Sequence, residues 1–327
     1  MPDSSVSPNA FRQIFQVSAD ADETMRFDRF MSLALYHPEV GYYSAARPRI
    51  GFEKGTDFYT STTSNPVFGE LIAAACIKLL GARPVSEYTF WEIGAESSGG
   101  MLEHVAHPFK AVRTCRLGES MEMAGKCVVF SNELFDAQPF RRFVARGARW
   151  REYGVQQRGS ELFPVELAVS EIPRELPIGL PDGYGIDTPL AAADLAGSIA
   201  TLPWTGLFVA FDYGKSWREL TEACPAGTAR AYFRHTQSND LLAHPGQQDI
   251  TCHVCWDWLV STIEQLGFIK PTLESQESFF IRHACDYIAS ASAAEALQFT
   301  RRKASLLQLL HPAHMGQKFQ VLHALRD

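Results

Sequence analysis

Residues 88–94 read YTFWEIG, a short run of β-forming residues that ends in glycine, and this stretch decides the fold. Two later runs have a similar character. CVVF at 127–130 and LFVAF at 207–211 are continuously apolar, and polar residues follow each of them. Continuous apolar strands separated by helical segments are typical of a parallel sheet with helices on both faces. The sequence therefore predicts an α/β fold built on a parallel sheet.

Polar residues follow the predicted strands at their carboxyl ends, where ligands bind in parallel sheets. One rim of the sheet is thus expected to hold Glu92, Gly94, Asn132, Glu133, Asp136 and Asp212. The glycines of residues 94–100 either let the backbone approach a nucleotide-like ligand or form an ordinary turn. The segment SNELFDAQP at 131–139 either binds a cation or a substrate nitrogen through its carboxylates, or caps a following helix. Both alternatives stay open for each segment.

Two helices are predicted before the first strand. An Asp20-x-x-Glu23 capping-box pattern precedes an amphipathic run, and residues 65–81 carry the start and stop signals of a second helix. Between them, residues 41–62 are rich in glycine, aromatic and hydroxyl side chains. This region is expected to be either a lid over a flat ligand or a folded cap on the core.

Composition excludes some classes of protein. The chain has 327 residues, 37 acidic and 30 basic, with a formal net charge of −7 and a pI near 5.8. This balance argues against a duplex-DNA clamp, and 46% apolar residues exclude disorder across the whole chain. No apolar run is long enough to span a membrane, and the start shows no targeting segment. Seven scattered cysteines fit a reducing compartment, so a cytoplasmic protein is expected. Because of the acidic charge balance, we expect no nucleic-acid partner.

The segment CHVC at 252–255 has metal-like or redox-like spacing. A structural zinc site needs two more ligands, and neither His235 nor His244 supplies a matching pair. We therefore expect ordinary half-buried cysteines and no metal site. His235 and His253 are each either structural histidines or catalytic groups.

Taken together, several blocks of the sequence resemble the MidA family of S-adenosylmethionine-dependent methyltransferases. That family includes the mitochondrial factor that methylates an arginine of respiratory complex I. The blocks follow one another in the family's order: ALYxPxxGYY (34–43), DFxTS (57–61), ExG (92–94), NExxDAxP (132–139), DYG (212–214), GTxRxYxxH (227–235) and PGxxDITxHV (245–254). Chance does not explain so many blocks in the right order.

The resemblance implies a class I (Rossmann-like) methyltransferase core, S-adenosylmethionine as cofactor and a protein arginine as methyl acceptor, with a respiratory-complex subunit as a candidate partner. Arginine stays protonated at neutral pH, so adjacent carboxylates would orient it and offset its charge. The implied catalytic residues are Glu133, Asp136, Asp212 and His235. The implied cofactor-binding residues are Asp57, Thr60, Glu92, Gly94, Glu96, Ser98, Gly99, Glu119 and Asn132.

The sequence departs from the family pattern in the cofactor half. Glu96 stands where the family has glycine, and the family has a second glycine near the position of Ser98. The connection at 95–126 has room for only one helix, at about 99–106, and one strand, at about 111–117, so the central sheet is expected to be shortened. In this register Glu119 falls where the family has an acid that holds the ribose, whereas another register places it in the lead-in to the next strand.

The expected organisation is a disordered lead-in at 1–10, a helical and loop region at 11–86 that covers the cofactor site, and a methyltransferase-like core at 87–327. Elaborations that bind substrate or partner are expected at about 140–205 and 225–290. Two hypotheses stay open: an active protein-arginine methyltransferase, and a non-catalytic relative that acts as a binding or assembly module. The shortened sheet would expose a strand that a helix, a loop or a second copy in a homodimer could cover.

Overall fold

The computed structural model describes residues 8–44, 66–95, 100–169, 171, 176–294 and 300–327. The chain divides into two compact units, each assembled from three segments. Unit 1 comprises Met1–Phe58, Phe135–Asp194 and Lys215–Trp258, and unit 2 comprises Tyr59–Leu134, Leu195–Gly214 and Leu259–Asp327. Each unit has a hydrophobic core of its own.

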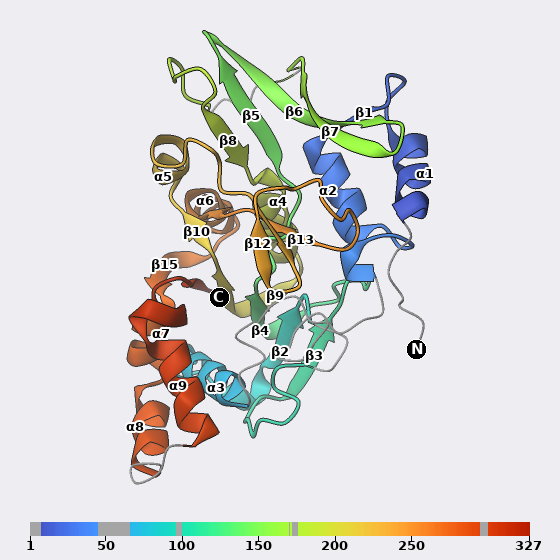
Figure 1. Cartoon of the computed structure of the whole chain (residues 1–327). Coiled ribbons are helices and arrows are strands. Elements are labelled where there is room, and N and C mark those ends of the chain that lie inside the picture. The colour runs from blue at the N-terminus through green and yellow to red at the C-terminus, as the bar shows by residue number, and fades with distance from the viewer. Residues whose placement is uncertain (1–7, 45–65, 96–99, 170, 172–175, 295–299) are drawn as a thin grey trace. The chain divides into compact units, whose positions relative to one another are not determined.

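Among the described residues, unit 2 forms a six-stranded sheet in the order β15-β16-β9-β4-β2-β3 (Figure 1). Its strands are β2 (Thr89–Ile93), β3 (Ala111–Cys115), β4 (Gly125–Asn132), β9 (Trp204–Asp212), β15 (Ile269–Ser275) and β16 (Gln320–Arg326). β2 pairs in parallel with β3 and β4, β4 pairs in parallel with β9, and β16 runs antiparallel between β9 and β15. The three apolar runs are thus neighbouring strands, and the predicted α/β fold with a parallel sheet is confirmed.

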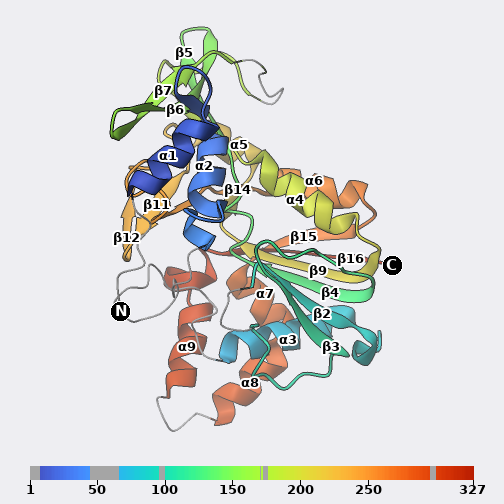
Figure 2. The same ribbon diagram turned by 90° about the vertical axis from the view of Figure 1, so that its right-hand side faces the viewer.

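Helices cover both faces of this sheet, as Figure 2 shows. One face carries α3 (Val67–Leu80), α7 (Gln276–His283), α8 (Cys285–Ala294) and α9 (Arg301–Leu310), and the other carries the parts of α4 (Leu190–Ala200) and α6 (Trp256–Gln265) that belong to this unit. Phe68 of α3 packs edge-on against Phe130, Phe211 and Phe280, with ring centroids 5.6 to 6.3 Å apart. Aromatic rings thus join α3 to the sheet and to α7.

The cofactor half of the sheet is short, as expected. β3 is the only described strand between β2 and β4 along the chain, and it forms one edge of the sheet. The strand expected at 111–117 is confirmed as β3. The prediction of a helix at 99–106 is wrong for residues 100–106, which the structure describes. Residues 100–105 form tight turns, in which Glu103 N–H donates to Gly100 O and Val105 N–H to Leu102 O. A homodimer through the β3 edge stays a prediction.

Unit 1 begins with α1 (Pro8–Ser18), β1 (Thr24–Arg26) and α2 (Phe27–Tyr36). The capping box expected at Asp20 and Glu23 is wrong. Asp20 N–H instead donates to Thr24 O, and Glu23 has a φ of 58°, so the chain turns and then enters β1, which pairs with β6. Pairing in the sheet prevails over the local helix signal here, and α2 starts only at Phe27.

The main sheet of unit 1 is antiparallel, in the order β1-β6-β5-β8 with β7 on β6. Its other strands are β5 (Arg141–Arg146), β6 (Arg149–Arg158), β7 (Glu161–Leu167) and β8 (Gly185–Thr188), and a second sheet contains β11 (Arg230–Phe233), β12 (Thr236–Ser238) and β13 (Asp249–Thr251). The other described elements of the chain, taken over both units, are β10 (Gly214–Lys215), β14 (Val254–Cys255), α5 (Trp217–Glu222), η1 (Tyr42–Ser44), η3 (Val85–Glu87) and η4 (Pro312–Gly316).

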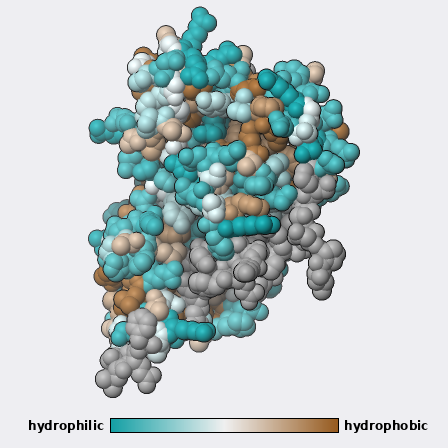
Figure 3. Space-filling view, viewed as in Figure 1, coloured by the Kyte–Doolittle hydropathy of each residue, from teal (hydrophilic) through white to brown (hydrophobic). Residues whose placement is uncertain are grey.

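None of the helices in the described part of the chain is long and apolar enough to cross a membrane. All seven cysteines are outside disulfides. In the region of α7 to α9, at the lower left of Figure 3, hydrophobic residues reach the surface, and Ile281 and Leu307 are about half exposed there. Leu306, Leu307 and Leu310 of α9 line an apolar pocket with Ile288 and Ala291 of α8.

Candidate functional site

Strands β2, β4 and β9 end side by side at one edge of the sheet in unit 2. Ile93 is opposite Ser131, and Asn132 is opposite Phe211, so the residues next to these positions lie along the same edge. The structure therefore brings together five of the predicted residues: Glu92, Gly94, Asn132, Glu133 and Asp212. This is the edge where a ligand of a parallel sheet is expected.

Glu92 is a buried carboxylate, 7% exposed. Its Oε2 accepts a hydrogen bond from the backbone N–H of Met101 at 2.6 Å. Burial raises the pKa of Glu92 to about 7, although the bond from Met101 and the charge of Arg116 act in the opposite direction. This carboxylate therefore joins the backbone of Met101 to strand β2.

Two glycines, Gly94 and Gly100, allow the backbone to approach its surroundings closely. Gly94 has a φ of 79°, and a Cβ there would lie 2.9 Å from Leu134 Cδ1. A Cβ at Gly100 would lie 2.9 Å from Thr114 Cγ2 and 3.2 Å from Glu92 Oε2. A side chain at either position would thus need its neighbours to move.

Asn132 is the last residue of strand β4, and Glu133 follows it in an unusual backbone conformation. Asn132 Nδ2 donates to Glu133 Oε1 at 3.0 Å, while Asn132 Oδ1 is buried without a hydrogen-bond partner in the described structure. Glu133 has a φ of 51°, in the left-handed region that favours glycine, and its N–H donates to Phe211 O. Backbone strain and an unsatisfied buried acceptor are both characteristic of functional sites.

Asp212, the last residue of β9, is fully buried. Its Oδ1 accepts a hydrogen bond from the backbone N–H of Tyr213 at 2.8 Å. Asp212 therefore holds the backbone at the end of β9 in place. Of the two carboxylates Glu133 and Asp212, Glu133 is the one that is partly exposed.

Glu119 lies in the turn that follows β3, at the carboxyl end of that strand. Its Oε2 accepts from the N–H of Arg116 at 2.7 Å, and Gly118 has a φ of 82°. Of the two registers considered, this agrees with the one that places an acid just beyond the second strand. Asp57, Thr60, Glu96, Ser98 and Gly99 lie outside the described residues.

Asp136 and His235 belong to unit 1. Asp136 is buried, and its backbone O accepts from Cys252 N–H at 2.9 Å. The alternative that Asn132 or Asp136 caps a following helix is wrong, because the next element is strand β5. His235 is exposed in the turn between β11 and β12, where it and Arg234 have φ values of 64° and 49°.

Within unit 1, several of the blocks that carry the resemblance bind one another. Tyr36 Oη donates to Ala137 O at 2.8 Å, and Tyr43 Oη donates to Asp249 Oδ1 at 2.9 Å. Burial raises the pKa of both tyrosines, so their hydroxyls stay protonated. These tyrosines therefore connect the N-terminal block to two later ones.

Asp187 anchors another of these blocks, although no sequence signal singled it out. Its Oδ2 accepts from the N–H groups of Thr228 and Ala229 at 2.7 and 2.9 Å, and its Oδ1 accepts from Arg142 Nε at 2.7 Å. Gly227 has a φ of 72°, and a Cβ there would lie 2.3 Å from Asp187 Oδ2. The glycine of this block is thus required by a buried ion pair.

The CHVC segment contains buried Cys252 and Cys255, and Cys252 Sγ lies 3.4 Å from Thr228 Oγ1. Burial raises the pKa of Cys252, which disfavours a reactive thiolate. Burial also lowers the pKa of His253 to about 4, and its Nδ1 is buried without a partner in the described structure. His253 is therefore neutral at physiological pH.

The sheet of unit 2, with its polar edge and glycine turn after β2, defines the chain as a protein of the class I methyltransferase fold. Residues 103–272, just over half of the chain, match a family described as "Putative S-adenosyl-L-methionine-dependent methyltransferase". The chain belongs to this family, and the predicted MidA-like membership is confirmed. S-adenosylmethionine is accordingly its cofactor.

Two solved structures from Burkholderia thailandensis share the fold. One was solved with S-adenosylhomocysteine bound; it has 23% identity, covers 100% of this chain and 94% of its own, and superposes with a TM-score of 0.87. The other is a native crystal structure of an uncharacterised protein; it has 22% identity, the same coverage and a TM-score of 0.84. No curated protein sequence matches the chain significantly.

Proposed function

We propose that the chain transfers the methyl group of S-adenosylmethionine to an arginine of a protein, with respiratory-complex subunits as the first candidates. The observation that carries this proposal is Glu133, a partly exposed carboxylate that a left-handed backbone and the Asn132 amide hold at the sheet edge. A carboxylate so positioned would orient a guanidinium and offset its charge before the attack. The acceptor class rests further on the family resemblance.

The described residues fit the cofactor at the same edge. Asn132 Oδ1 is a buried acceptor without a partner in the described structure, and Glu92 and Gly94 lie at the carboxyl end of β2. Glu119 lies beyond β3, where it could bind hydroxyl groups. We propose that these four residues hold the cofactor, which supplies an electrophilic methyl group when bound. Asp212 would position the strand end, whereas the catalytic roles of Asp136 and His235 stay predictions.

Calorimetry with S-adenosylmethionine tests the first half of the proposal. We expect a micromolar dissociation constant that weakens about tenfold in Asn132→Ala, since one buried hydrogen bond would be lost. Glu264→Gln, an exposed acid on α6 of the same unit, is the matched control and should leave the affinity unchanged. No heat up to millimolar cofactor would contradict the proposal.

The second half needs a methyl-transfer assay. Tritiated S-adenosylmethionine and lysate proteins from methylation-inhibited cells should yield methylarginine on amino-acid analysis. Glu133→Gln should lower the rate about a hundredfold with cofactor affinity kept within twofold, because the charge acts on the acceptor. Label in another amino acid would show that this residue, and not arginine, accepts the methyl group.

The second candidate function is a non-catalytic binding module, and the short sheet between β2 and β4 favours it. This candidate predicts no cofactor binding and no labelled product, while the chain still folds. The same two assays therefore separate the two candidates.

A further inference from the structure

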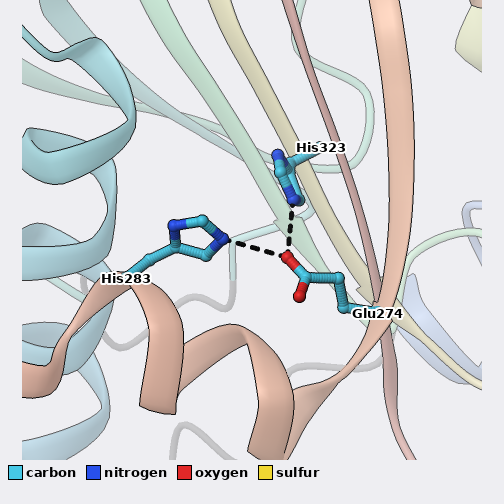
Figure 4. Close-up of side chains that lie close together, drawn as sticks. All are labelled: Glu274, His283 and His323. Carbon is cyan, nitrogen blue, oxygen red and sulfur yellow. Dashed lines mark hydrogen bonds and ion pairs between the residues drawn. The ribbon is translucent and has the colours of Figure 1, made fainter.

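Three side chains converge on one point of unit 2, where α7 meets strands β15 and β16. Figure 4 shows Glu274 from β15, His283 from the end of α7 and His323 from β16. His283 Nε2 lies 2.9 Å and His323 Nε2 lies 3.0 Å from the same oxygen, Glu274 Oε1. The three potential ligand atoms all lie within 4.8 Å of one another.

The fold holds these side chains in place. Thr272 pairs with His323 and Glu274 pairs with Val321, so Glu274 and His323 are diagonal neighbours on one face of the sheet. Phe279, one turn before His283 on α7, is buried with its ring centroid 5.2 Å from that of His283 and 5.5 Å from that of His323. One aromatic ring thus contacts both imidazoles and limits their movement.

The carboxylate of Glu274 offers one oxygen to this point, because its other oxygen is already bound. Arg282 Nη1 donates to Oε2 at 2.7 Å, and the Arg282 side chain is itself largely exposed. Water therefore screens its charge, which opposes a bound cation only weakly. The carboxylate keeps a fixed orientation of the kind that supporting contacts give to metal ligands.

We propose that Glu274, His283 and His323 bind one divalent transition-metal ion of the zinc class. Two imidazole nitrogens and one carboxylate oxygen suit Zn²⁺, whereas Mg²⁺ and Ca²⁺ prefer all-oxygen sites. Tetrahedral zinc places its ligand atoms about 3.3 Å apart, so the two distances from the imidazole nitrogens to Glu274 Oε1 need to open by only a few tenths of an ångström. Each imidazole would bind through an unprotonated Nε2 with its proton on Nδ1, and water would take the fourth position.

Such an ion would join α7 to β15 and β16. Without the ion, the same residues form a hydrogen-bonded cluster in which both imidazoles donate to Glu274. These alternatives differ in what they predict for a metal titration.

The test is a titration of the full chain, stripped with a chelator, by ZnCl₂ in a calorimeter and by CoCl₂ in a spectrophotometer. We expect one ion per chain at micromolar affinity or tighter, together with the intense visible bands of tetrahedral cobalt. Glu274→Gln and His323→Ala should weaken binding at least tenfold. His314→Ala, which removes an exposed histidine of η4 beside His311, controls for surface binding and should change nothing.

Glu274→Gln keeps an oxygen that accepts hydrogen bonds from both imidazoles, so it should fold, and circular dichroism checks this. The proposal is overturned if the wild-type chain binds no zinc or cobalt. It is equally overturned if folded Glu274→Gln binds zinc as tightly as the wild type, since the ion would then lie elsewhere.

Discussion

The polar residues that carry the family motifs have different surroundings in the two units. In unit 1, Tyr43, Asp249 and Asp187 are engaged in hydrogen bonds that join separate blocks of the chain, although Gln157 Oε1, Tyr184 Oη and His253 Nδ1 of this unit are buried without a partner in the described structure. At the sheet edge of unit 2, by contrast, Glu92 has a raised pKa, Glu133 has a left-handed backbone and Asn132 has an unsatisfied oxygen. The difference teaches that family motifs of the same apparent importance serve folding in unit 1, whereas at the sheet edge of unit 2 they form the proposed ligand site.

Replacing Asp187 by Asn should give the largest effect, because it tests the folding role in unit 1. The substitution leaves the Arg142 guanidinium without its buried partner, which typically costs about 3–5 kcal/mol of unfolding free energy. Chemical denaturation followed by circular dichroism measures this loss. Glu222→Gln, in an exposed pair with Arg218, should stay within about 0.5 kcal/mol of the wild type, and an equal loss in both variants would remove the contrast.

Replacing Glu92 by Gln should have the opposite sign at the unit 2 edge. The wild-type stability from this group is present below a pH of about 4.5 and is lost as the pH rises through about 7, because the folded state prefers the neutral acid. The amide oxygen still accepts from Met101 but does not ionise. The variant should therefore gain about 2–3 kcal/mol relative to the wild type between pH 5 and pH 8.

Denaturant titrations of both proteins at the two pH values measure this gain. Glu264→Gln at the same pH values controls for global charge. A variant that is less stable than the wild type at pH 8 would show that Glu92 serves folding after all.

Replacing Tyr43 by Phe should give the smallest of the three effects. It removes the hydroxyl that donates to buried Asp249 and should cost about 1–2 kcal/mol. Tyr232→Phe is the matched control, because its hydroxyl contacts Gln237 at 3.3 Å near the surface. Thermal unfolding distinguishes the two, and equal melting temperatures would weaken the folding role assigned to unit 1.

Patterns that local physics controls could be predicted from the sequence. The apolar runs at 127–130 and 207–211 became β4 and β9, and the start and stop signals at 65–81 became α3 (Val67–Leu80). The length of the 95–126 connection predicted the short sheet correctly, because a strand and its crossover need a minimum number of residues. The rim residues of unit 2 followed directly from the strand ends.

Features that depend on distant partners could not be predicted. The capping pattern at Asp20 starts no helix, because the chain after it forms β1 and pairs with β6, whose residues lie more than a hundred positions later. Asp187 is an isolated acid in the sequence and gains its importance only from the backbone of residues 227–229. The Glu274, His283 and His323 cluster likewise comes from three elements without a common motif.

The position of β16 also bears on how the chain folds as it is synthesised. β16 lies between β9 and β15, although both are made before it. Until residues 320–326 have left the ribosome, β9 lacks one neighbour and β15 has none of its sheet pairings. The growing chain therefore exposes the apolar edge of β9 until β16 has been synthesised.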